Sequence, residues 1–153
     1  MRDHLTKLLA TFFYVGNVPV APGSLASLAG TLLVIALCGH PGLYVFLFLV
    51  ITLVGFAVSG RVEKLLGQKD PSCVIIDEVS GVLLALFMLP LTPAVIVTTF
   101  FLFRAFDMFK IYPVNRFEEL PGAVGIMADD LWAGFYTNIV MQLAIRWAGM
   151  MNL

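Results

Sequence analysis

The sequence predicts an all-α membrane protein that crosses the bilayer several times. Of its 153 residues, 60% are hydrophobic and 12% are charged, whereas soluble domains are roughly half apolar and a quarter charged. No Asp, Glu, Lys or Arg occurs from Leu8 to Gly60 or from Val79 to Phe103. Uncharged stretches of this length are typical of segments that lie in lipid. We therefore expect one membrane-embedded domain over residues 1–153, with four to five membrane helices and an N-terminal interfacial helix.

The N-terminal part of the chain predicts two helices separated by a turn. Residues 5–15 could form the interfacial helix, and Gly16–Gly23, which contains two prolines, predicts a turn. Ser24 is a residue type that caps helix N-termini, so we expect it to begin a helix that runs to about Cys38. The turn residues from Gly39 to Gly42 end that helix.

The clearest membrane span is predicted from Leu43 to Ser59. The loop after it, Gly60–Ile76, carries three basic residues, whereas the loop before it has no Lys or Arg. Because basic residues are enriched in cytoplasmic loops, we expect the 60–76 loop to lie on the cytoplasmic side. The last span is expected from about Leu131 to Ala148. Five crossings would then place all ten acidic residues at the cytoplasmic face.

Residues 79–103 are apolar, but Pro90 and Pro93 interrupt them, and two interpretations stay open. They could form one kinked span or a hairpin of two short helices. We favour the hairpin, because it keeps the charged residues before and after this segment on one side of the bilayer. Its weakness is length: a helix from Val79 to Leu89 would be only about 16 Å long, against a hydrocarbon core of roughly 30 Å. Such a helix must extend backwards, or the bilayer must thin.

Composition and motifs exclude several functional classes. The net charge of −1 gives no basic surplus of the kind that marks a nucleic-acid-binding protein. Cys38 and Cys73 are too few for a disulfide framework or a zinc pattern. The sequence contains no Gly-x-Ser-x-Gly motif, P-loop or Cys-x5-Arg phosphatase signature. Covalent catalysis by Ser or Cys is therefore disfavoured.

Three groups of charged residues stand at the ends of apolar segments, where at least some of them must be partly buried. They are Asp77 and Glu78, then Arg104, Asp107 and Lys110, and finally Asp129 and Asp130. An unpaired carboxylate in such a position is unstable by a few kcal/mol, so each needs a cation or a polar partner. Arg104, Asp107 and Lys110 are three residues apart, so each can pair with the next along a helix. The three charges could therefore simply neutralise one another.

The remaining acids outnumber the nearby buried bases, and this excess predicts a magnesium site. Mg²⁺ binds oxygen ligands and commonly bridges one or two carboxylates to a substrate phosphate. The expected ligands are Asp77, Glu78, Asp129 and Asp130. Arg104 and Lys110 would then bind phosphate oxygens, and the helix N-terminus at Ser24 could add a further contact.

Several stretches of the chain carry a more specific signal when taken together. They are Gly16–Ser24, Asp70–Pro71 with Ile76–Gly81, Phe103–Asp107 with Lys110 and Pro113, and Gly125–Asp130 with Ala133–Gly134. In this order they resemble the motifs of the phosphatidylglycerophosphatase A family of small bacterial membrane enzymes. The chain departs from that family at Ser24, Ile111 and Ala123, where Thr, Pro and Gly are usual.

The resemblance implies a Mg²⁺-dependent phosphatase that converts phosphatidylglycerophosphate to phosphatidylglycerol at the inner face of the bacterial cytoplasmic membrane. The expected partners are this lipid substrate and membrane lipids, with no nucleic acid. Asp107 would either complete the metal shell or orient Arg104. The number of metal ions and the oligomeric state stay open. The catalytic acids in this hypothesis are Asp77, Glu78, Asp107, Asp129 and Asp130.

Two other functions compete with this hypothesis. A CDP-alcohol phosphotransferase also uses acids and a divalent metal at the membrane edge, but its repeated Asp-x3-Asp pattern is missing here. A small cation transporter subunit could line an ion site with acids. It predicts acids at mid-membrane depth, however, and it gives Arg104 and Lys110 no obvious task.

Overall fold

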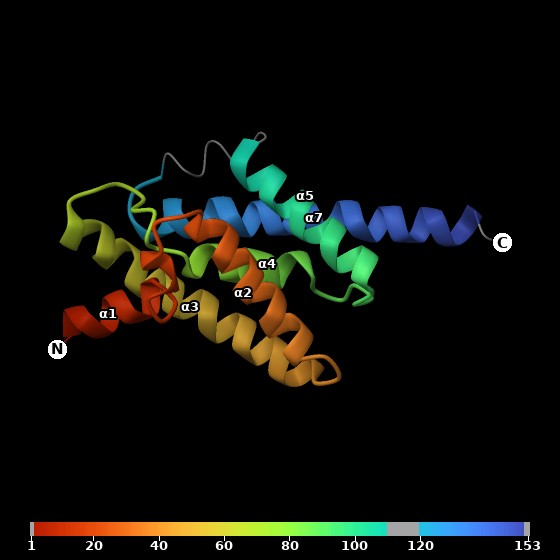
Figure 1. Ribbon diagram of the computed structural model, residues 1–153, viewed down its shortest axis with the longest axis horizontal. Helices are drawn as coiled ribbons and strands as arrows, with labels where there is room; N and C mark the ends of the chain where they lie inside the picture. The colour runs from red at the N-terminus through yellow and green to blue at the C-terminus, as the bar shows by residue number, and fades with distance from the viewer. Residues whose placement is uncertain (1, 110–119, 152–153) are drawn as a thin grey trace.

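The computed structural model describes residues 2–109 and 120–151, and within them the chain is all-helical (Figure 1). Six α-helices and one 3-10 turn form there, with no strand, which confirms the predicted all-α class. The elements are α1 (Arg2–Ala10), η1 (Val15–Asn17), α2 (Pro22–Ala36), α3 (Pro41–Leu66), α4 (Ile76–Ala85), α5 (Pro93–Phe109) and α7 (Ala123–Met151).

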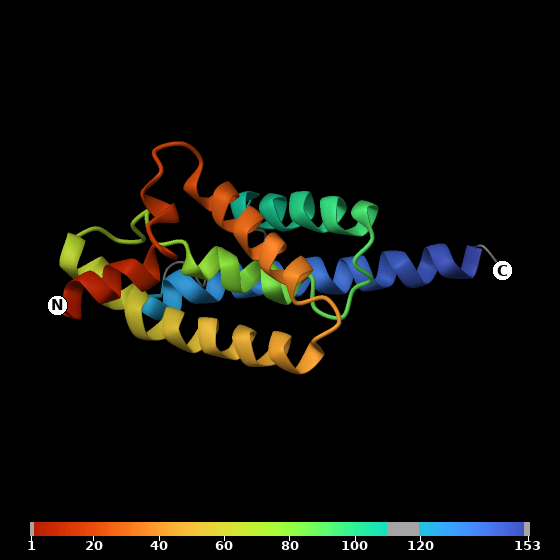
Figure 2. The same cartoon turned by 60° about the horizontal axis from the view of Figure 1, so that its bottom comes forward.

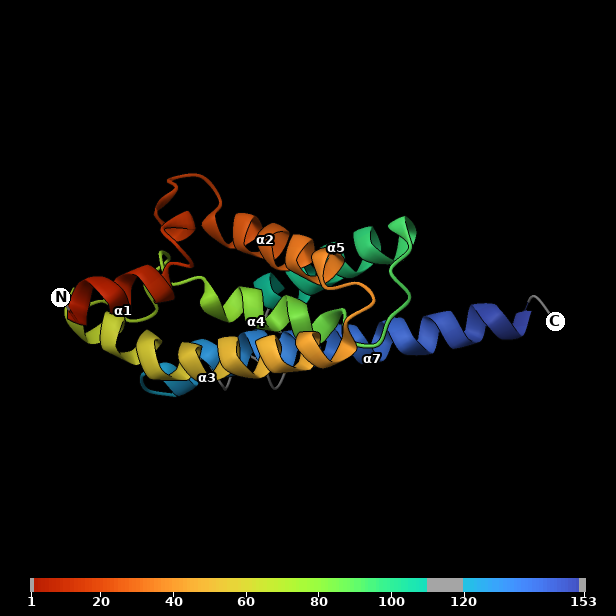
Figure 3. The same ribbon diagram turned by 90° about the horizontal axis from the view of Figure 1, so that it is seen from below.

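The short helix α4 is the centre of the bundle. It contacts α2, α3, α5 and α7, and Figure 3 shows it between α2 on one side and α3 and α7 on the other. Eight of its ten residues are buried, and Val79, Val82 and Leu83 belong to the main hydrophobic core. Because other helices cover α4, its backbone does not need to match the thickness of a bilayer. The short length that weakened the hairpin interpretation is thereby explained.

The C-terminal end of α4 is closed by side chains from two other helices. The hydroxyl of Tyr44 on α3 donates a hydrogen bond to the carbonyl of Leu83. The amide of Asn138 on α7 donates to the carbonyl oxygens of Ala85 and Phe87, at 3.1 and 2.7 Å. The last carbonyls of a helix lack intrahelical partners. These hydrogen bonds therefore let α4 end inside the protein.

The segment with the two prolines forms two helices, as the hairpin interpretation predicted. Helix α4 ends at Ala85, and α5 begins at Pro93, where a proline without an N–H is well tolerated. The chain reverses between them, so the start of α4 and the end of α5 lie at the same end of the bundle (Figure 2). This reversal places Asp77 and Asp107 at one end of the molecule.

The N-terminal helices differ from the prediction in their bounds. Helix α1 ends at Ala10, and the three residues 12–14 have positive φ angles. Helix α2 begins at Pro22, with Ala21 as its N-cap at a φ of 46°. The predicted capping role of Ser24 is therefore wrong: proline takes the first helical position, and Ser24 falls within the first turn.

Helix α3 is longer than the predicted span, because it continues from Pro41 to Leu66. The first part of the predicted 60–76 loop is thus helical, and Arg61 on it pairs with Asp3 of α1 at 3.0 Å. Within the described ranges, α3 is the one helix both long and apolar enough to cross a membrane. Further crossings remain a proposal.

Helix α7 begins at Ala123, eight residues before the predicted span. Asp129 and Asp130 therefore lie inside this helix and do not precede it. Because they are charged, we expected them to stand outside the apolar helix. Instead, both residues lie on the helix face that packs against the interior, where Asp129 is 6% exposed and Asp130 is 4% exposed. The last part of α7 extends beyond the other helices (Figure 1).

Candidate active site

A cavity of about 410 Å³ opens where α2 begins, α5 ends and α4 begins. Helix α7 contributes its second turn, and the segment before α4 closes one wall. The lining is polar along much of its surface, since it includes six carboxylates and a guanidinium. The lining residues are Ala21, Pro22, Gly23, Ser24, Asp70, Ser72, Val74, Asp77, Glu78, Arg104, Asp107, Met108, Asp129 and Asp130.

Two glycines allow the acids of α4 and α7 to meet. A Cβ built on Gly134 would lie 2.3 Å from the carbonyl oxygen of Gly81, and one built on Gly81 would lie 2.7 Å from the carbonyl oxygen of Asp130. Side chains four residues apart share one face of a helix. Asp77 is four residues before Gly81, and Asp130 is four before Gly134, so the close glycine contact sets the two carboxylates side by side.

Asp77, Glu78 and Asp130 form a cluster suited to a cation. Each offers one oxygen, and these three oxygens all lie within 4.8 Å of one another. Asp77 is 5% exposed and Asp130 is 4% exposed. Asp77 Oδ1, Glu78 Oε2 and Asp130 Oδ1 are buried without a hydrogen-bond partner. Carboxylates taken out of water in this way need a positive charge or protons, so the donor set fits a hard divalent cation.

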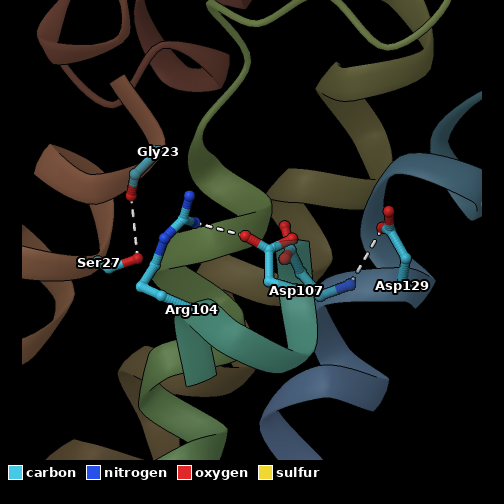
Figure 4. A network of polar contacts seen from close by, with 6 residues as sticks. Gly23, Ser27, Arg104, Asp107 and Asp129 are labelled. Atoms are coloured by element: carbon cyan, nitrogen blue, oxygen red, sulfur yellow. Dashed lines mark hydrogen bonds and ion pairs between the residues drawn. The ribbon is translucent and has the colours of Figure 1, made fainter. Parts of the chain in front are cut away.

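Asp129 lies beside this cluster. Its Oδ1 accepts a hydrogen bond from the backbone N–H of Asp130 at 3.0 Å (Figure 4). Of the four acids predicted as metal ligands, the structure thus brings three together, and the fourth lines the same cavity.

Arg104 and Asp107 form an ion pair on α5. Arg104 Nη1 lies 2.5 Å from Asp107 Oδ2, and each side chain is 17% exposed (Figure 4). The sequence left open whether the charges of this helix only neutralise one another. Arg104 Nε is buried without a hydrogen-bond partner, so the ion pair does not use the whole guanidinium. Lys110, the third predicted member, lies outside the described residues.

The start of α2 packs directly against these groups. A Cβ built on Gly23 would lie 2.5 Å from Glu78 Oε1 and 3.1 Å from Arg104 Nη1. Glycine thus lets the first turn of α2 approach the acid cluster and the guanidinium without displacing either side chain. The first helical hydrogen bond of α2 runs from the N–H of Leu25 to Ala21. The N–H groups of Gly23 and Ser24 precede it, in the part of a helix that favours anions.

Sequence reasoning did not identify every residue that lines the cavity. Asp70 lies in its wall with a φ of 46°, which is unusual for a residue other than glycine. The Asp70-Pro71 pair formed part of the family resemblance, but no function was predicted for Asp70 from the sequence. Ser72 and Met108 also line the cavity and were not predicted.

A family model described as phosphatidylglycerophosphatase A matches residues 8–145. The chain belongs to the phosphatidylglycerophosphatase A family. This match covers all the cavity residues and confirms the resemblance drawn from the motifs. Members of this family are phosphatases, so the chain is a phosphoric monoester hydrolase.

Two of three curated relatives carry the name of this family. Phosphatidylglycerophosphatase A of Haemophilus influenzae is 35% identical over 144 residues, which cover 92% of this chain and 88% of the relative. Phosphatidylglycerophosphatase A of Escherichia coli is 31% identical over 130 residues, covering 83% and 76%. A Bacteroides thetaiotaomicron protein named as a candidate phosphatidylinositol-3-phosphatase is 33% identical over 152 residues, covering 94% of each chain. No solved structure matches the chain.

Proposed function

We propose that this chain hydrolyses the phosphomonoester of phosphatidylglycerophosphate and releases phosphatidylglycerol and inorganic phosphate. The observation that carries the proposal is the cluster of Asp77, Glu78 and Asp130, which brings one carboxylate oxygen of each residue within 4.8 Å of the others and leaves one oxygen of each buried without a hydrogen-bond partner. Beside it lie a guanidinium and a helix N-terminus. A cation site and an anion site in one cavity suit a metal-dependent phosphatase.

The proposed metal is Mg²⁺, held by Asp77, Glu78 and Asp130. Asp129 stays a proposed ligand because it lines the same cavity. All these ligands are carboxylates, and the absence of sulfur and imidazole among them favours a hard cation over zinc. When bound, the cation supplies Lewis-acid polarisation of a phosphoryl oxygen.

The protein's own cations and dipoles bind the phosphate. Arg104 donates from the part of its guanidinium that Asp107 does not use, and Gly23 and Ser24, whose N–H groups lie in the first turn of α2, line the same cavity. Negative charge spreads over the phosphoryl oxygens in the transition state, so fixed donors at this position lower the barrier. Of the two roles left open for Asp107, the ion pair favours orientation of Arg104 over metal binding. Lys110 remains a proposed phosphate ligand.

The substrate is proposed to reach the cavity from the cytoplasmic side of a bacterial cytoplasmic membrane that the chain crosses several times. Helix α3 has the length and composition of a membrane span, and Arg61 and Lys64 lie on its last turns. The segment that follows α3 supplies Asp70, Ser72 and Val74 to the cavity wall, so the cavity lies towards the basic end of α3. Basic residues mark the cytoplasmic side. The large apolar side chains exposed on several helices also support contact with lipid.

The headgroup specificity needs its own test, because the Bacteroides relative carries the name of a different lipid phosphatase. Both substrates are phosphomonoesters on a phospholipid headgroup, so the site chemistry is shared. Purified protein in detergent micelles should be assayed with phosphatidylglycerophosphate and with phosphatidylinositol 3-phosphate, at equal surface concentration. The proposal expects phosphate release from the first at a clearly higher kcat/KM. Preference for the inositol lipid, or no release from either, contradicts it. A cation transporter subunit would release no phosphate.

A further inference from the structure

Helix α2 carries an exposed apolar stripe that begins at the active-site cavity. Ser24 lines the cavity, and Leu28, Leu32 and Ile35 follow it at helical spacing with exposures of 48%, 58% and 45%. Residues at these positions lie within one narrow sector of a helix surface. The opposite sector of α2 is buried against α4, so this stripe is the outer face of the helix.

Helix α5 carries a second stripe that also leads to the cavity. Val97 and Phe101 are exposed at 54% and 66%. Arg104 and Met108 continue the same face at the next helical steps, and both line the cavity. Met108 is 70% exposed, so its side chain belongs both to the cavity wall and to the outer surface. Exposed apolar side chains on α5 thus lead at helical spacing to the guanidinium in the cavity wall.

The two stripes leave the cavity in the same general direction. Helix α2 begins at the cavity and α5 ends there, and the two helices contact one another. Figure 2 shows both helices extending from that end of the bundle towards the opposite end. Their 15 and 17 residues correspond to lengths of about 22 and 25 Å. With its cavity residues included, each face covers about 16 Å, from Ser24 to Ile35 on α2 and from Val97 to Met108 on α5, which is about the thickness of one leaflet of a hydrocarbon core of roughly 30 Å.

We propose that α2 and α5 form an acyl-chain track, defined by Leu28, Leu32, Ile35, Val97 and Phe101. The occupant is the pair of fatty acyl chains of the substrate lipid, while its phosphate lies in the cavity. An occupant must be anionic at the cavity end and apolar along the helices, and a phospholipid with a terminal phosphate meets both conditions. This inference rests on the proposed function and adds where the substrate enters and what selects its chains.

The exposed apolar residues of α3 do not lead to the cavity in this way. Leu49 and Leu53 on α3 are exposed at 52% and 68%, but no residue of α3 lines the active-site cavity. They are suited to bulk lipid and serve as matched controls. Met108 is unsuited to a test of the track, because it also belongs to the cavity.

The test compares chain-length discrimination in two double variants. Leu28→Ala/Phe101→Ala removes contact area from the track, and Leu49→Ala/Leu53→Ala removes it from α3. All four positions are exposed, and alanine favours helix, so both proteins should fold. Each is assayed with long-chain phosphatidylglycerophosphate and with a soluble analogue that has four-carbon acyl chains. The measured quantity is the ratio of kcat/KM for the long-chain substrate to that for the short-chain one.

The track predicts that this ratio falls about tenfold in the α2/α5 variant, because several methylene contacts are lost. The rise in KM for the long-chain substrate should account for the change. The α3 variant should keep the wild-type ratio. An unchanged ratio in the α2/α5 variant, or an equal fall in the α3 variant, overturns the track. If the wild-type protein hydrolyses neither substrate, the proposed function itself fails, and that outcome is distinct from a wild-type enzyme with unaltered discrimination.

A direct measurement keeps the track falsifiable if a variant does not fold. Long-chain phosphatidylglycerophosphate with a photoreactive group near the end of one acyl chain is cross-linked to the wild-type protein. Cross-links to α2 and α5 that excess unlabelled substrate suppresses support the track. Labelling of these helices that substrate does not suppress, at the level seen for α3, overturns it.

Discussion

The α-carbon of Gly134 on α7 lies so close to α4 that an added Cβ would be 2.3 Å from the carbonyl oxygen of Gly81. This contact is one helical turn from the acid cluster on both helices. Its consequence is that Asp77 and Asp130, which are far apart in the sequence, present their oxygens to one point. The site therefore depends on the absence of two side chains as much as on the presence of three carboxylates.

Gly134→Ala should both destabilise the protein and inactivate it. The neighbouring atom is backbone, so α4 and α7 must move apart, and overpacking of this kind costs about 1–3 kcal/mol. Thermal unfolding and phosphate release measure the two effects. Gly149→Ala on the same helix is the control, because nothing lies within 4 Å of its Cβ position. That variant should be neutral or more stable by up to about 1 kcal/mol. Equal behaviour of the two variants would show that the glycine contact is not tight.

Gly23→Ala should separate activity from stability. The added Cβ meets the ends of two flexible side chains, Glu78 and Arg104, which can move aside. We expect little change in the melting temperature. Activity should fall about 10- to 100-fold, because small displacements of catalytic groups have effects of this size. A variant with wild-type turnover would mean that the position of neither side chain matters for the reaction.

Asn138→Ala should destabilise the protein through the end of α4. It leaves the carbonyl oxygens of Ala85 and Phe87 without their donor, and a buried unpaired group costs about 1–3 kcal/mol. Denaturant unfolding measures the loss. Gln142→Ala is the matched comparison, since Gln142 only donates to the side chain of Asn138. Gln142→Ala should lower the free energy of unfolding by less than Asn138→Ala does. A larger loss in Gln142→Ala would mean that the hydrogen bonds from Asn138 to Ala85 and Phe87 contribute little to stability.

The sequence alone predicted the charged residues of the site but not the way they are brought together. Two prolines in an apolar run left one kinked span or a hairpin open, and the charged residues on either side favoured the hairpin that α4 and α5 form. The start of α7 was missed because Asp129 and Asp130 were expected to precede a span, whereas burial against α4 lets a helix carry both. The contact between Gly81 and Gly134 depends on how α4 and α7 pack, so it could not be predicted from the position of either glycine in the sequence.

The bounds of α2 and α3 show a related limit. Ser24 has the side chain of a helix cap, yet Pro22 begins the helix, since a fixed φ at the first position overrides capping preference. Polar residues such as Arg61 suggested a loop after α3, but a helix can continue past the apolar stretch when its charges find partners such as Asp3. The composition of a segment predicts that it forms an apolar helix more reliably than it predicts the residues at which that helix begins and ends.

Asp107→Asn tests whether Asp107 orients Arg104 or binds metal. The ion pair predicts that the variant loses activity while its apparent affinity for Mg²⁺ is unchanged. Arg104→Gln should be more severe, with a loss of about 10²–10³ in kcat, as expected for removal of a transition-state donor. Magnesium titrations of activity give both numbers. A large rise in the Mg²⁺ concentration needed by Asp107→Asn would instead make Asp107 a metal ligand.

Magnesium should also stabilise the folded protein, because it neutralises carboxylates that are buried close together. A ligand that binds only the native state raises the melting temperature as its concentration rises. The wild-type protein should show this increase with Mg²⁺, and chelation should reverse it. Asp77→Asn should show a smaller increase, since one ligand is lost. An equal increase in both proteins would mean that the cation binds elsewhere.

The most direct test of the central claim is phosphate release from phosphatidylglycerophosphate, measured over a Mg²⁺ titration for the wild-type protein and for Glu78→Gln and Asp130→Asn. The acid cluster predicts that wild-type turnover requires Mg²⁺ and that both variants, while folded, lose nearly all activity even at saturating Mg²⁺. Near wild-type turnover in either variant at saturating Mg²⁺, or full wild-type activity after chelation, would contradict it.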